Sequence, residues 1–132
     1  MDDDTFLLKI EEGTLDPSFF NHVGHLRLAW IYLQRLPLDE AIRKTCDSIQ
    51  RYATGLGASA KFHWTISEAL VRLMHAAGAS DPERDWQAFV NTKPPLLTDA
   101  RAVLGCHYSP AQLARPEARE LFLEPDLLPL PA

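Results

Sequence analysis

Three apolar patterns with helical spacing, separated by proline and glycine, constrain the fold of this chain more than any other feature of its sequence. The first pattern, over residues 19–36, repeats apolar side chains at intervals of three and four and leaves few plainly polar positions. This predicts a helix that is buried around most of its circumference. The helix is expected to begin after Pro17, or with Asn21 as its N-cap, and to end before Pro37. We expect it to be the central helix.

Two further helices are predicted with apolar side chains along one face. Residues 38–53 carry a regular apolar seam opposite a charged face, and residues 61–77 carry a second seam that closes at Gly78. A fourth helix is expected to start at Asp81, because the next residue is a proline and an aspartate N-cap with proline at the first helical position is a common helix start.

The remaining segments are predicted to be short or irregular. Short helical pieces are expected over residues 97–104, 109–114 and 116–122, and the Pro-rich residues 123–132 are expected to lie across the body as an extended tail. Residues 1–15 are expected to form an N-terminal segment of poor order. No sustained strand-like alternation occurs, so the whole chain is predicted to be one all-α domain, a helical bundle of three to four main helices with short C-terminal helices.

Composition excludes several functional classes. The chain of 132 residues has a net charge of −5 and shows no basic run or stripe, which argues against nucleic acid as a partner. No apolar stretch approaches the roughly 20 residues that cross a bilayer, and the chain begins with an acidic segment rather than the basic start of a signal peptide. We therefore expect a cytoplasmic protein without a membrane partner, whose oligomeric state the sequence does not determine.

The residues with most chemical potential are three histidines at helix starts. His22 and His25 are three residues apart, so their Cβ atoms should lie about 5–6 Å apart on one helix face. His63 lies at the start of the third helix and would join them if the first and third helices begin at the same end of the bundle. Three imidazoles with an open fourth position are typical of catalytic zinc sites, and imidazole also suits iron and nickel. The sequence thus gives a candidate site for a divalent transition metal.

Two other roles for these histidines stay open. Histidines near helix starts also satisfy local polar groups at the edge of a core, and a neutral imidazole near a positive helix end suits a general base or an organic ligand equally well. Aromatic and hydroxyl side chains near the predicted site or along the seams are either contacts to a small-molecule ligand or core residues. These candidates are Tyr32, Tyr52, Trp64 and Ser67.

Several short motifs resemble a family of small uncharacterised bacterial all-α proteins. The motifs are Phe20-Asn-His-x-x-His-Leu, Ala29-Trp-x-Tyr-Leu, Phe62-His-x-Thr-Ile-Ser, Tyr108-Ser-Pro-x-x-Leu and Phe122-x-x-Pro-Asp-x-x-Pro. The resemblance covers nearly the whole chain from Phe19 onward and singles out the same three histidines, but it implies no activity. The family pattern often has Glu directly after the third histidine, where this chain has Trp64, which argues against a carboxylate-dependent reaction here.

Two functions follow as alternatives. The first is a metal-dependent or histidine-dependent enzyme that acts on a small molecule. The second is a non-enzymatic helical protein that binds a small ligand or a protein partner and uses its histidines structurally. A closed aromatic cavity would favour a ligand, and an exposed apolar patch would favour a partner.

Overall fold

The computed structural model describes residues 1–131, and within them it contains helices and connections but no strand. This confirms the predicted all-α fold, with main helices α1–α4 followed by short C-terminal helices. The elements are α1 (Asp3–Glu12), η1 (Pro17–Phe19), α2 (His22–Arg35), α3 (Leu38–Gly55), η2 (Ser59–Lys61), α4 (Trp64–Ala76), α5 (Trp86–Asn91), α6 (Pro95–Thr98), α7 (Ala100–Gly105), α8 (Pro110–Leu113) and α9 (Pro116–Glu120).

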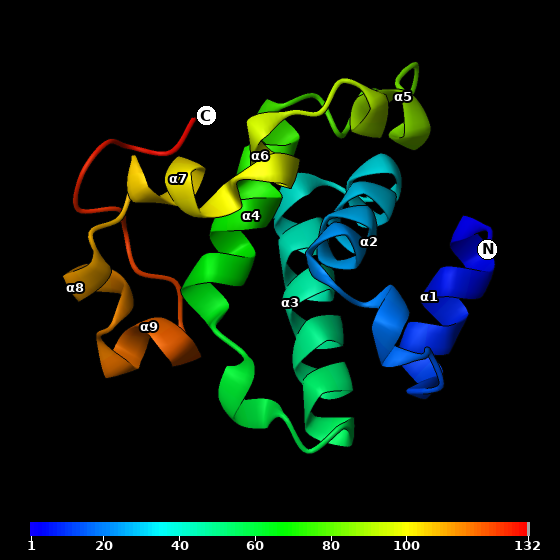
Figure 1. Ribbon diagram of the computed structural model, residues 1–132, viewed down its shortest axis with the longest axis horizontal. Helices are drawn as coiled ribbons and strands as arrows, with labels where there is room; N and C mark the ends of the chain where they lie inside the picture. The colour runs from blue at the N-terminus through cyan, green and yellow to red at the C-terminus, as the bar shows by residue number, and fades with distance from the viewer. Residues whose placement is uncertain (132) are drawn as a thin grey trace.

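The core lies where α2, α3 and α4 meet. Helices α3 and α4 lie side by side and run in opposite directions, and α2 packs against both (Figure 1). Helix α1 packs on α3, and the short helices α6–α9 lie on the other side of α4 from α1 (Figure 1). None of the helices within residues 1–131 is both long and apolar enough to span a bilayer.

Helix α2 is the central helix that the apolar pattern predicted. Eight of its fourteen residues are buried, and it begins with Asn21 as N-cap, whose side chain accepts a hydrogen bond from the Gly24 amide at 3.0 Å. Gly24 is required for a steric reason, because a Cβ atom there would lie 2.4 Å from the carbonyl oxygen of Phe19. The turn of η1 can therefore pack directly against the first turn of α2.

Helix α4 begins later than the sequence predicts. The expected start was residue 61, but η2 occupies residues 59–61 and α4 starts at Trp64. His63 is the N-cap, with an extended backbone at φ −138°, and its ring nitrogen accepts a hydrogen bond from the Ile66 amide. The start of α4 is thus set by a histidine cap, which is an uncommon residue at this position.

The predicted helix start at Asp81 is wrong. The Asp81 carboxylate accepts a hydrogen bond from the Glu83 amide at 2.9 Å, which forms a local turn, and α5 begins only at Trp86 with Asp85 as its N-cap. The helix begins where it can pack on α2, since the ring of Trp86 lies 5.7 Å from that of Trp30. Packing across the fold therefore decides between two aspartates that are both suitable caps.

Residues 1–15, which were expected to have poor order, instead contain α1. Phe6, Leu7 and Ile10 of this helix are buried in the core. Arg27 of α2 holds the segment by donating hydrogen bonds to the Met1 carbonyl at 2.6 Å and to a neighbouring aspartate, and its guanidinium lies 4.7 Å from the centre of the Phe6 ring.

The tail after α9 is extended and bound to the body, as predicted. The Thr65 hydroxyl donates to the Leu121 carbonyl at 2.8 Å and accepts from the Leu123 amide at 3.1 Å. Further along, the Leu127 amide donates to the His107 carbonyl at 3.0 Å. These bonds replace the helical ladder that prolines exclude from this segment. Residue 132, the last of the predicted tail, lies outside the described residues.

Candidate functional site

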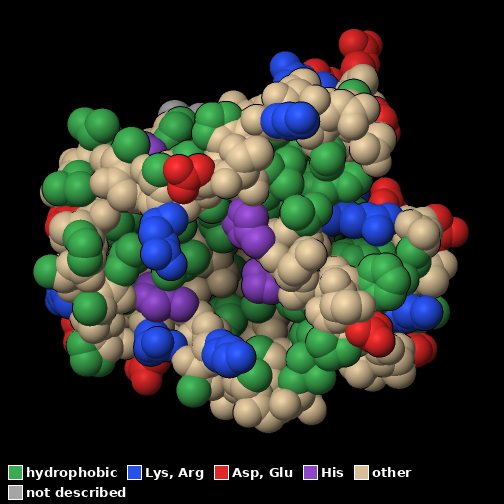
Figure 2. Space-filling view, in the orientation of Figure 1, with side chains coloured by type: hydrophobic (Ala, Val, Ile, Leu, Met, Phe, Trp, Pro, Cys, Tyr) green, Lys and Arg blue, Asp and Glu red, His purple; other side chains and the backbone are tan. Residues whose placement is uncertain are grey.

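A small cavity lies between α2, α3, η2 and α4, and we call it the central pocket. Its volume is about 150 Å³. In space-filling view, histidine side chains gather around a hollow in this face of the molecule, with Lys and Arg side chains beside them (Figure 2). The pocket is lined by His25, Leu26, Ala29, Thr45, Ile49, Lys61, Phe62, His63, Ile66, Ser67, Leu70 and Val71. Most of these side chains are apolar, so the few polar ones determine its chemistry.

His25 stands at one wall of the central pocket without a protein hydrogen-bond partner for its ring among the described residues. The ring packs against Phe20 at 4.3 Å between ring centres. Burial, with a smaller contribution from the neighbouring charge of His22, lowers the pKa of His25 from 6.5 to about 4. The ring is therefore uncharged at neutral pH and offers one hydrogen-bond donor and one acceptor.

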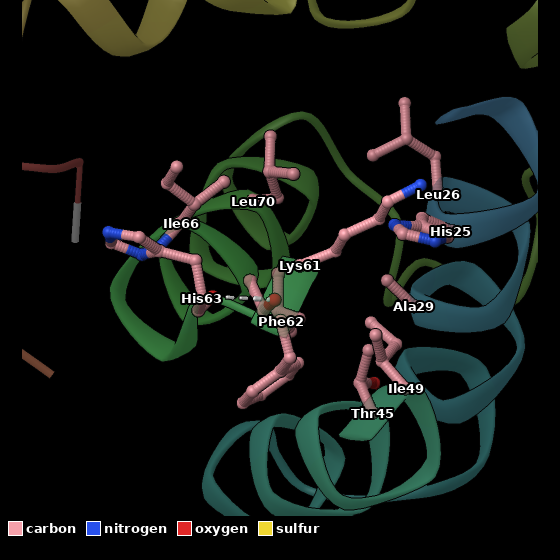
Figure 3. A pocket seen from close by; sticks show the side chains of 12 residues that line it. His25, Leu26, Ala29, Thr45, Ile49, Lys61, Phe62, His63, Ile66 and Leu70 are labelled. Atoms are coloured by element: carbon pink, nitrogen blue, oxygen red, sulfur yellow. Dashed lines mark hydrogen bonds between the residues drawn. The ribbon is translucent and has the colours of Figure 1, made fainter. Parts of the chain in front are cut away.

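His63 is used by the fold itself. Its Nδ1 accepts from the Ile66 amide at 3.1 Å, and its Nε2 lies 2.8 Å from the Leu113 carbonyl oxygen. A carbonyl oxygen can only accept, so Nε2 carries the proton and donates it to that bond. Both ring nitrogens are occupied, and the ring points away from the pocket (Figure 3). His63 caps α4 and ties it to α8.

The three histidines do not converge on one point. His22 lines a neighbouring pocket, and its Nε2 donates to the Leu96 carbonyl at 3.0 Å. Within residues 1–131, no group of three or more His, Cys, Asp or Glu side chains is arranged to hold a metal ion. The physical reason is the cap: as N-cap of α4, His63 turns its ring back onto its own first turn and toward Leu113 instead of toward His25.

Thr45 is a site residue that the sequence pattern did not reveal. It belongs to the apolar seam of α3 and lines the central pocket, with only 2% of its surface exposed. Its Oγ1 is buried and has no hydrogen-bond partner in the described chain. A buried hydroxyl without a partner costs about 1–3 kcal/mol, so it is an unusual group to keep in a core. A threonine within an otherwise apolar seam was the only signal in the sequence.

Lys61 gives the central pocket a positive charge. The side chain is exposed on η2 and extends across the pocket toward His25 (Figure 3). Among the described residues Lys61 forms no ion pair, and no Asp or Glu lines the pocket. A small ligand here would meet apolar walls, one cation, and four uncharged polar side chains, of which His63 and Ser67 already hydrogen-bond within the fold.

Of the four ligand-contact candidates from the sequence, only Ser67 lines the central pocket. Its hydroxyl already donates to the His63 carbonyl at 2.9 Å. Tyr32 is buried in the core and shares a hydrogen bond with a serine hydroxyl. Tyr52 donates to the Leu15 carbonyl, and Trp64 donates its indole proton to a glutamate. The three aromatic residues therefore have the core role that was one of their two predicted roles.

Within residues 1–131, the polar side chains of the central pocket without a hydrogen-bond partner are thus Thr45 and His25, and Lys61 extends across the pocket toward His25. This set can hold a small organic molecule by one or two hydrogen bonds while the apolar walls bury its body. No family model matches this chain, and no curated protein and no solved structure matches it either.

Proposed function

We propose that this protein binds a small organic molecule in the central pocket, with a mostly apolar body and one hydrogen-bonding group. The observation that carries this proposal is the Thr45 hydroxyl, which is buried at the pocket without a hydrogen-bond partner in the part of the chain that the structure describes. Thr45 lines the pocket while its Oγ1 is buried, so a ligand reaches Oγ1 once the side chain turns about χ1. A hydrogen bond to the ligand would then recover the free energy that the unpaired hydroxyl costs the empty protein. Thr45 then serves binding at the expense of stability.

The volume of the pocket limits the size of the ligand. An apolar cavity of the same volume, about 150 Å³, takes benzene in another protein. The ligand is therefore expected to have about six to eight non-hydrogen atoms. Leu26, Ile49 and Leu70 would contact its apolar body.

The hydrogen-bonding chemistry favours a hydroxyl group on the ligand. Thr45 can donate or accept, and the uncharged ring of His25 can do the same through its two nitrogens. A phenol or a compact alcohol can donate to one of these residues and accept from the other. The proposal follows the ligand-binding alternative from the sequence, in which the histidines are structural, but it keeps that structural role only for His63 and makes His25 a ligand contact.

Phenol and toluene are the probes that test this function, because they differ only in the hydroxyl and methyl groups. Amide chemical-shift titration should place phenol at residues around the central pocket and give it about tenfold tighter binding than toluene. In Thr45→Val the preference for phenol should be lost while toluene binding persists. Thr65→Val, a change at a buried threonine outside the pocket, is the matched control and should keep the preference.

Two results would count against the proposal. One is shifts for phenol that lie outside the pocket, and the other is an equal preference for phenol in Thr45→Val and the unchanged protein. Elemental analysis of untagged protein tests the metal-site alternative directly. If a stoichiometric transition metal is found and is lost in both His22→Ala and His25→Ala, the site is a metal centre and the proposal of an organic ligand is wrong.

A further inference from the structure

A second, larger cavity lies beside the central pocket, and we call it the tail pocket. Its volume is about 510 Å³, and Ile66 and Leu70 of α4 belong to the walls of both cavities. The opposite walls come from α7 and α8 and from Leu127 of the extended tail. A cavity of this size falls in the range of pockets that bind drug-sized small molecules.

The lining of the tail pocket is apolar except at a few positions, and most of its polar groups already have partners. The Tyr108 hydroxyl donates to the Leu123 carbonyl at 2.7 Å, and the Ser109 hydroxyl donates to Asp126 at 2.5 Å. His22 donates through Nε2 to the Leu96 carbonyl. These three groups therefore have no proton left to donate to an anionic ligand.

Arg101 is the exception. It is the one charged side chain among the lining residues, and it forms no ion pair with any residue of the described chain. Among residues 1–131, no Asp or Glu lines the cavity. A guanidinium next to an apolar cavity matches a ligand with one anionic end, since a carboxylate can accept two parallel hydrogen bonds from it.

We propose that the tail pocket binds a linear carboxylic acid, with its carboxylate on Arg101 and its hydrocarbon chain against Leu104, Leu113 and Leu127. A chain of about ten carbon atoms suits a cavity of this size. The ligand is a free single-chain acid and not a lipid in a bilayer surface. Docking on an anionic bilayer depends on a cluster of basic residues, whereas one arginine serves this cavity.

This site is separate from the proposed function of the central pocket. The two cavities share a wall but have different free polar groups: Thr45 and His25 in one, Arg101 in the other. Decanoate binding should therefore persist in Thr45→Val, and phenol binding should persist in Arg101→Gln. Failure of either proposal leaves the other intact.

The test compares three ten-carbon probes with different head groups: decanoate, decanol and decyltrimethylammonium. Calorimetric titration of the full chain, together with amide chemical shifts, should show decanoate binding most tightly and shifts around α7, α8 and the tail. In Arg101→Gln decanoate binding should weaken about tenfold, and decanol binding should stay unchanged. Arg43→Gln is the matched control, because Arg43 is also exposed and forms no ion pair with a described residue, but it lies on α3 outside the cavity. It should leave all three affinities unchanged.

Three outcomes would overturn the proposal. These are equal binding of decanoate and decyltrimethylammonium, an unchanged decanoate affinity in Arg101→Gln, and chemical-shift changes confined to surfaces outside the tail pocket. Because Arg101 is exposed, its substitution should leave the fold intact, which a helical circular dichroism spectrum verifies.

Discussion

Replacing Thr45 with valine should stabilise the protein. Valine has nearly the shape of threonine, so the packing of α3 against α2 and α4 is retained and only the hydroxyl is lost. In the folded protein that hydroxyl has no hydrogen-bond partner within residues 1–131, while in the unfolded chain it is hydrated. Removing it should therefore recover about 1–2 kcal/mol of the free energy of unfolding. For a chain of 132 residues this corresponds to a rise in Tm of about 3–6 °C.

The same substitution at Thr65 should have the opposite effect. Thr65 is as buried as Thr45, but its hydroxyl donates to the Leu121 carbonyl and accepts from the Leu123 amide. Thr65→Val leaves both tail groups without their partner, and we expect a loss of about 2–3 kcal/mol. Thr45→Val and Thr65→Val make the same chemical change at equally buried positions. If they change the free energy of unfolding in opposite directions, the difference therefore comes from the hydrogen bonds of the two hydroxyls.

Urea unfolding of the two variants and the unchanged protein, followed by circular dichroism, measures both effects on one scale. The reasoning is refuted if Thr45→Val lowers the free energy of unfolding by 1 kcal/mol or more, which would mean that the Thr45 hydroxyl has a stabilising partner. Adding phenol sharpens the comparison: it should raise the Tm of the unchanged protein more than that of Thr45→Val.

Three other features of the structure give measurable predictions. The pKa of His25 is about 4 in the fold and 6.5 in the unfolded chain, so the uncharged ring costs the fold nothing above pH 6.5. As the pH falls from 6.5 to 4, the unfolded chain binds the proton first, and the free energy of unfolding should drop by up to about 3 kcal/mol. Urea unfolding across this range should show a shallower decline in His25→Gln, and parallel curves would contradict the shift. Gly24→Ala should lower the free energy of unfolding by about 2 kcal/mol, because the new Cβ would meet the Phe19 carbonyl. Gly55→Ala, which has open space around it, should raise the free energy of unfolding by up to about 1 kcal/mol. Similar Tm values for the two variants would argue against the close approach at Gly24. His63→Ala should lower the free energy of unfolding by about 1–2 kcal/mol, and His63→Asn should recover part of this loss by capping α4. Equal stability of the two variants in urea would mean that the histidine contributes nothing to the cap.

The helices of the core could be predicted because their sequence patterns agree with local chemistry. Helix α2 has an apolar surface nearly all round and a proline after its end, which agree on where it stops, and of the two starts left open the one with the Asn21 cap is observed. The start of α5 could not be found in this way. Asp81 and Asp85 both suit a helix cap, and contacts of Trp86 with Trp30 on α2 select the second.

The site was predictable only as far as local spacing reaches. His22 and His25 do lie on neighbouring parts of α2, as their separation of three residues requires. The direction of the His63 ring depends on the Leu113 carbonyl, which is 50 residues further along the chain. The isolation of the Thr45 hydroxyl likewise depends on which surfaces of α2 and α4 cover it, and a seam pattern contains no information about that.

The way in which the tail is attached has a consequence for the opening motions of the protein. Amide hydrogens of Ser109, Leu123 and Leu127 each take part in a bond between the tail and the body, so they should exchange with deuterium together, as one cooperative unit. Release of this unit removes Leu127 from the wall of the tail pocket while α2 and α3 stay protected. The protection of these amides in the free protein then gives the free energy of releasing that wall of the cavity.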